Sequence, residues 1–143
     1  LIVVKDVLVE GRRFKRNMRI RLLEKKIENA YTPLLSEVEK LKMLYESMSE
    51  TARPKGGQIF VADRLRPNIA RIDKIMDAWG HLIETSVRDM WYEVLANAHT
   101  SKGYEQTKVL LERLKKEFDT LRVQYQEAIG AYVPSPKCNC RNL

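Results

Sequence analysis

The sequence predicts an all-α fold, an antiparallel bundle of three long helices. The main observation is that apolar residues recur every three or four positions over long stretches, which is the spacing of a helix that buries one face. Six Gly and five Pro among 143 residues are too few for a turn-rich β fold. Apolar residues make up 44% of the chain and charged residues 31%, a composition typical of one globular domain and not of a disordered chain.

The first helix is predicted from an apolar stripe between residues 20 and 48. Its members are Ile20, Leu23, Ile27, Tyr31, Leu34, Val38, Leu41, Tyr45 and Met48. Pro33 interrupts this run, because proline removes a helical hydrogen bond and clashes with the preceding turn. The stripe keeps its phase across Pro33, so we expect the first helix to be kinked near Pro33 and not to end there.

Two further stripes predict the other helices. A loop is expected at residues 49–66, where Pro54 and a Gly-Gly pair lie. The second stripe runs from residue 69 to 98 and predicts one continuous helix. The third runs from residue 110 to 132. Because the connection between the last two helices is short, we expect antiparallel neighbours.

Positive charge is concentrated at the N-terminal end. The formal net charge is +7. Residues 1–26 hold nine basic and three acidic residues, whereas the other 117 residues hold 17 basic and 16 acidic ones. Six cations lie between positions 12 and 21 with no acid among them: Arg12, Arg13, Lys15, Arg16, Arg19 and Arg21. The helices differ in length, so we expect this basic start of the first helix to protrude from the bundle.

The domain organisation follows from these patterns. We expect residues 1–30 to form a basic, juxtamembrane helical arm, residues 31–133 the helical bundle domain, and residues 134–143 a flexible tail.

The N-terminal residues are typical of a cytoplasmic membrane boundary. Four apolar residues, Leu1 to Val4, precede the basic cluster, and cations gather on the cytoplasmic side of membrane spans. We therefore expect an anchor upstream of Leu1, a location at the cytoplasmic face of the membrane, and contact between the six cations and an anionic membrane surface. The alternatives are a solvated charged helix and a nucleic-acid-binding arm with a steep salt dependence. The near-neutral remainder offers no second basic face, which disfavours nucleic acid.

Part of the first stripe also suggests self-association. A core of three helices is thin, and pairing with a second copy would deepen it. The candidates are Tyr31, Leu34, Val38, Leu41, Tyr45 and Met48. The simpler interpretation is that these side chains form the core of one chain. We expect a protein partner or a homo-oligomer.

Three short segments and one tryptophan carry a resemblance to a known group of proteins. They are Tyr31-Thr32-Pro33-Leu34-Leu35, Ile72-Asp73-Lys74-Ile75-Met76, Gly80-His81-Leu82-Ile83 and, further on, Trp91. With the basic helix before them, they resemble uncharacterised prokaryotic membrane-anchored helical proteins over residues 1–95. The resemblance implies membrane anchoring and a cytosolic helical domain, and it implies no activity.

Metal chemistry has little support. Asp77, His81, Glu84 and Arg88 fall at helical spacing on roughly one face. A di-iron bundle, however, needs a Glu-x-x-His step on two helices and two more carboxylates. Cys138 and Cys140 are two thiols one residue apart, whereas structural zinc usually takes four ligands. We expect a polar helix face and free thiols, with metal binding or a crosslink through the thiols as the alternative.

Other candidate sites are weaker. Trp79, Trp91 and Tyr92 are expected in core packing, with an exposed partner surface as the alternative. Lys55-Gly56-Gly57 lacks the pattern of a phosphate-binding loop. The sequence supports no enzyme, cofactor or small-molecule substrate. It favours a binding or assembly domain of a membrane-anchored protein. The alternatives are a nucleic-acid-binding helical protein and a metal-binding bundle.

Overall fold

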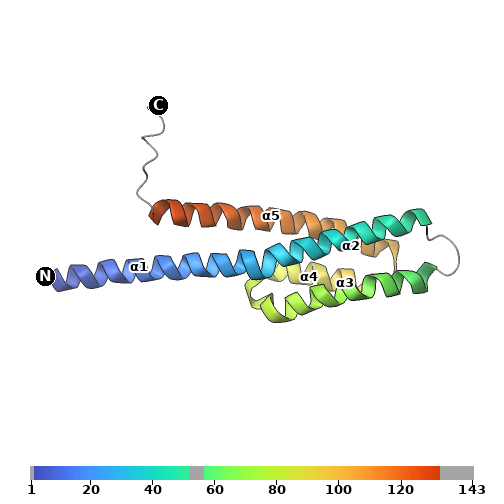
Figure 1. The fold of residues 1–143 in the computed structure, drawn as a ribbon, viewed down its shortest axis with the longest axis horizontal. Coiled ribbons are helices and arrows are strands. Elements are labelled where there is room, and N and C mark those ends of the chain that lie inside the picture. The colour runs from blue at the N-terminus through green and yellow to red at the C-terminus, as the bar shows by residue number, and fades with distance from the viewer. Residues whose placement is uncertain (1, 52–56, 133–143) are drawn as a thin grey trace, which may run out of the picture.

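The chain forms a bundle of helices, and the predicted all-α class is confirmed. The computed structural model describes residues 2–51 and 57–132, and no strand occurs in these two ranges. Figure 1 shows the elements in chain order. They are α1 (Ile2–Lys25), the π-helical turn η1 (Lys26–Tyr31), α2 (Thr32–Thr51), α3 (Gly57–Trp79), the 3-10 turn η2 (Gly80–Leu82), α4 (Thr85–Ala96) and α5 (Ser101–Tyr132).

The irregularity predicted near Pro33 is the π-helical turn η1, which ends two residues before it at Tyr31. Pro33 has no N–H group to offer the carbonyl of Asn29, four residues earlier. The helix widens instead, and the Thr32 N–H donates to the carbonyl of Ile27, five residues earlier. α1, η1 and α2 therefore continue as one long rod that changes direction slightly at η1 (Figure 1).

The prediction of one continuous second helix is wrong, because this part of the chain forms two helices, α3 and α4. After α3 the chain makes the turn η2, and Ile83 then adopts an extended conformation at φ −100° and ψ 137°. Glycine is a weak helix former, so Gly80 favours an end at this position. The backbone N–H of Glu84 is freed from the helix and donates to the Tyr31 hydroxyl at 3.1 Å. The side chain of Ile83 is buried, so the break itself packs into the core.

The hairpin that α3 and α4 form also reverses the direction of the last helix relative to the first. A three-helix arrangement would place the final helix parallel to the first. With α3 and α4 as separate arms, α5 instead runs antiparallel to the α1–α2 rod (Figure 1). It packs against α1, α2 and α4. The Tyr125 hydroxyl donates to Glu24 Oε1 at 3.0 Å, which fixes the C-terminal half of α5 against α1.

One continuous core follows the rod from Leu23 to Met48. Its largest fully buried side chain is Trp91 of α4. The indole Nε1 donates to Asp73 Oδ1 of α3 at 2.8 Å, so the polar edge of the buried ring is satisfied. Trp91 therefore joins the two arms of the hairpin that replaces the predicted second helix.

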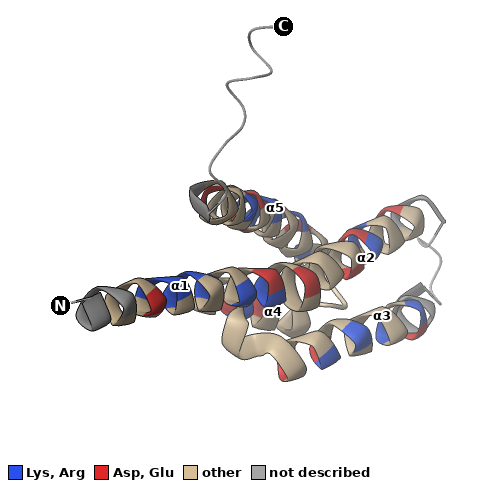
Figure 2. Cartoon of the chain, turned by 60° about the vertical axis from the view of Figure 1, so that its left-hand side comes forward, with Lys and Arg blue, Asp and Glu red and all other residues tan. Residues whose placement is uncertain are grey.

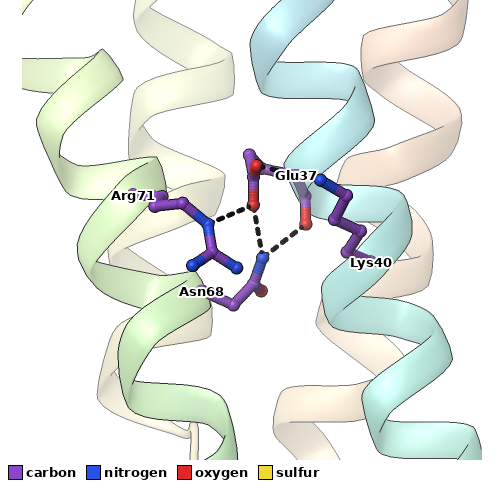
Figure 3. Close-up of polar contacts among 4 residues, drawn as sticks. All are labelled: Glu37, Lys40, Asn68 and Arg71. Atoms are coloured by element: carbon purple, nitrogen blue, oxygen red, sulfur yellow. Dashed lines mark hydrogen bonds and ion pairs between the residues drawn. The ribbon is translucent and has the colours of Figure 1, made fainter.

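A polar contact joins α2 to α3 (Figure 3). Asn68 is fully buried, and its Nδ2 donates to the Glu37 carbonyl at 3.0 Å and to Glu37 Oε2 at 2.8 Å. Arg71 Nε donates to the same Oε2 at 3.0 Å, and Lys40 Nζ donates to Oε1 at 3.3 Å. Burial raises the pKa of Glu37, but the bonds from Arg71 and Lys40 outweigh it and lower that pKa. The contact fixes how α3 lies along α2.

The turn between α4 and α5 closes against the far end of α2. The Tyr45 hydroxyl donates to the Ala98 carbonyl at 2.7 Å. Gly103 lies beneath it, where an added Cβ would collide with the Asn97 carbonyl and come within 2.9 Å of the Tyr45 hydroxyl oxygen. Glycine is therefore needed here because of the close approach of the two chain segments.

Candidate functional site

The exposed stretch of α1 is the candidate site. Side chains are described from Val7 onward, and every residue from 7 to 19 is exposed. Ile20 is half-buried, and Leu23 is the first buried side chain of α1. We call residues 7–22 of α1 the basic arm. Figure 2 shows the Lys and Arg positions following one another along this part of the helix.

The six cations that we expect to contact a membrane all lie in the basic arm, and all six are exposed. The structure brings three of them, Lys15, Arg16 and Arg19, together at an open groove between α1 and α5. Glu127 and Ala128 of α5 form the other wall, and the groove has a volume of about 430 Å³. Arg12, Arg13 and Arg21 do not line this groove. The arrangement therefore provides a local cationic groove and further cations along the same helix.

The electrostatics of the basic arm differ from those of the bundle. No acidic residue lies between positions 12 and 21, so neighbouring helical turns carry like charges. Like-charged residues three or four apart on a helix repel each other weakly. An anion that contacts several of them relieves this repulsion and gains attraction from each. The basic arm is therefore suited chemically to a surface or polymer with many negative charges.

The six self-association candidates lie inside the chain's own core. Tyr31, Leu34, Val38, Leu41, Tyr45 and Met48 are each at most 9% exposed. Burial raises the pKa of Tyr31 against the opposing effect of its bond from the Glu84 backbone. Burial also raises the pKa of Tyr45 to about 12. A second copy would reach these side chains only if the bundle opened.

The polar candidates of the second stripe do not form one helical face. The break at residues 80–84 lies between Asp77 and Arg88 and interrupts the helical spacing on which the prediction depended. Arg88 Nη2 instead donates to Thr85 Oγ1 at 3.3 Å. Within residues 2–51 and 57–132, no three His, Cys, Asp or Glu side chains group as metal ligands. Cys138 and Cys140 lie outside the described residues, as do Lys55 and Gly56.

The aromatic candidates are separated. Trp91 belongs to the core, whereas Tyr92 is 61% exposed on the outer side of α4. Trp79 is half-buried at the end of α3, with its ring centroid 6.2 Å from that of His81. Core packing is thus observed for Trp91, and the three rings do not form one patch.

Sequence reasoning missed a second property of the basic arm. Val7, Phe14, Met18 and Leu22 are exposed apolar residues interleaved with the cations. Their spacing of seven, four and four residues was readable in the sequence. The stripe that starts at Ile20 is stronger, and it alone predicts buried core residues.

Comparisons with known proteins give no further guide to this site. No protein-family model matches the chain, and neither a curated protein nor a solved structure resembles it significantly. Among the helices of residues 2–51 and 57–132, none is both long and apolar enough to span a bilayer.

Proposed function

We propose that this chain is a helical binding and assembly domain of a membrane-anchored protein at the cytoplasmic face, and that its basic arm contacts anionic lipid headgroups. The observation that carries the proposal is the exposure of all six cations on one helix with no acid among them. Each cation near an anionic membrane surface contributes about 1 kcal/mol of binding free energy. The cations that face an anionic surface together can therefore supply a stable, salt-sensitive contact.

The distribution of charge also orients the domain. The 117 residues after residue 26 carry almost equal numbers of basic and acidic groups. Attraction to an anionic surface therefore acts mainly on α1, and the field falls off within about 10 Å at ordinary salt. The bundle, which α1 continues into through η1, would remain on the cytosolic side. It is the part that we propose to meet a protein partner or a second copy.

The test is cosedimentation with vesicles made of equal parts phosphatidylcholine and phosphatidylglycerol. The variant Arg12→Gln/Lys15→Gln/Arg19→Gln removes three charges from the basic arm. Its matched control, Lys74→Gln/Lys102→Gln/Lys116→Gln, removes three exposed charges from the bundle. We expect the first variant to lose at least about tenfold in affinity, whereas the control binds like the wild type.

Two further samples make this test decisive. Vesicles of pure phosphatidylcholine should not bind the wild-type chain. A mixed-sequence RNA or DNA pool should bind more weakly than the anionic vesicles. Tight nucleic-acid binding without vesicle binding, or equal losses in the two variants, would overturn the proposal.

A further inference from the structure

The basic arm exposes apolar side chains as well as cations. Four of them are Val7 at 61%, Phe14 at 66%, Met18 at 50% and Leu22 at 45% exposed. At about 100° per residue, these four project within about 80° of one another on the helix surface. We call them the apolar line. Gly11 falls on the same line and adds no side chain, so nothing interrupts it.

The apolar line faces away from the rest of the protein. Ile20 and Leu23 are the first residues of α1 that pack into the core. At the same 100° per residue, they project about 140–200° from Met18 around the helix. α5 also packs against α1, and the groove between the two helices is lined by Lys15, Arg16 and Arg19 and by no member of the apolar line. The bundle therefore leaves the apolar line open along the basic arm.

Cations border the apolar line on both sides. Lys15 and Arg19 lie on one side, within about 100° of Met18, and Arg21 lies on the other, about 60° away. Two acids of this helix, Glu10 and Glu24, fall on the Arg21 side, so positive charge is denser along the Lys15 side. An apolar strip with basic borders is the pattern of a helix that lies in the plane of a membrane interface.

We propose that the apolar line inserts into the boundary between headgroups and acyl chains of an anionic bilayer, with α1 lying in the membrane plane. This inference rests on the proposed function and adds a hydrophobic contact to it. Two copies meeting along the apolar line would bring their bordering cations together and repel each other. The same cations gain attraction at an anionic lipid surface, so the charge pattern favours lipid as the occupant.

The first test removes the apolar line and leaves every charge in place. The variant is Phe14→Ser/Met18→Ser/Leu22→Ser. The matched control is Met43→Ser/Tyr92→Ser/Val109→Ser, which replaces side chains of similar exposure on α2, α4 and α5. With the equal-mixture vesicles, we expect the first variant to lose at least about tenfold in affinity. The control should lose none.

The outcomes separate this inference from the proposed function. If the apolar variant binds as tightly as the wild type and binding remains salt-sensitive, insertion is overturned and the electrostatic contact stands. If the wild-type chain does not bind anionic vesicles at all, both the insertion of the apolar line and the proposed function are overturned. A dimer of the wild-type chain that the apolar variant alone loses would assign the apolar line to a second copy and overturn insertion.

A second measurement does not depend on the triple variant. In a Cys138→Ser/Cys140→Ser background, Met18→Cys is labelled with a polarity-sensitive nitrobenzoxadiazole dye. Val123→Cys, exposed to a similar degree on α5, is the control. On adding anionic vesicles, we expect a blue shift and an increase in emission at position 18 and neither at position 123. An unchanged spectrum at position 18, with binding confirmed by sedimentation, would rule out insertion.

Discussion

Single residues fix the turn between α4 and α5. Gly103 is the clearest case, because a Cβ at this position would collide with the Asn97 carbonyl. We expect Gly103→Ala to destabilise the fold by about 1–3 kcal/mol through overpacking. Gly130→Ala is the matched control on the same helix, since a Cβ there meets nothing within 4 Å. That control should stabilise the fold by about 0.5–1 kcal/mol. Urea unfolding measures both, and equal effects would contradict the packing described.

The buried hydroxyl of Tyr45 makes stability fall at alkaline pH. Its pKa is raised from 10.0 to about 12 by burial. Below pH 10 both the folded and the unfolded state keep this proton. Between pH 10 and about 12 the unfolded state alone loses it, so the free energy of unfolding falls by up to about 1.4 kcal/mol per pH unit.

The variant Tyr45→Phe tests this pH dependence. It removes the bond to the Ala98 carbonyl and should cost about 1 kcal/mol at pH 8. Because phenylalanine cannot ionise, the variant should lose less stability than the wild type between pH 10 and 12. Urea unfolding at a series of pH values measures the difference. Parallel curves for the two proteins would show that Tyr45 does not titrate with the expected shift.

At the scale of elements, the contact between α2 and α3 makes a charge-specific prediction. Asn68→Asp would place a second carboxylate where an amide now donates to Glu37 Oε2 at 2.8 Å. We expect a loss of about 3 kcal/mol at pH 7 from this buried, like-charged pair. Protonation of the carboxylate pair relieves the repulsion in the folded state, so the loss should be smaller at acidic pH than at pH 7.

The matched control for this prediction is Arg71→Ala. Arg71 belongs to the same contact, but 53% of its side chain is exposed. Exposed ion pairs contribute little, so this change should cost at most about 1 kcal/mol. Urea unfolding at pH 7 and pH 4.5 compares the two variants. A pH-independent loss in Asn68→Asp would mean that the buried contact does not form as described.

The elements also mark where sequence reasoning succeeds and where it fails. The stripe from Leu23 to Met48 predicted core residues correctly, because a helix that buries one face must repeat every three or four residues. The break after Trp79 was missed, since α3 and α4 each bury an apolar face and the periodicity runs on across η2. Gly80 favours the break, and a tertiary contact between residues far apart in the chain stabilises it, because the Glu84 backbone N–H donates to the Tyr31 hydroxyl.

At the scale of the whole molecule, the break between α3 and α4 sets the direction of α5 and so the topology of the bundle. With one more antiparallel arm, α5 returns alongside α1, and its residue Glu127 faces the cations Lys15 and Arg16 across a groove. The exposure of the six cations could be predicted from the sequence, because a run of like charges is stable only when it is solvated. The groove could not be predicted, since it depends on the direction of α5.

We propose that α1 is the part of the molecule that contacts an anionic membrane. The most direct measurement is hydrogen exchange by mass spectrometry, with and without vesicles of equal parts phosphatidylcholine and phosphatidylglycerol. We expect slower exchange of the backbone amides of residues 7–25 when vesicles are present, and unchanged exchange in α3 and α4. Protection confined to α3 and α4, or no change in α1 under conditions where the chain binds, would contradict it.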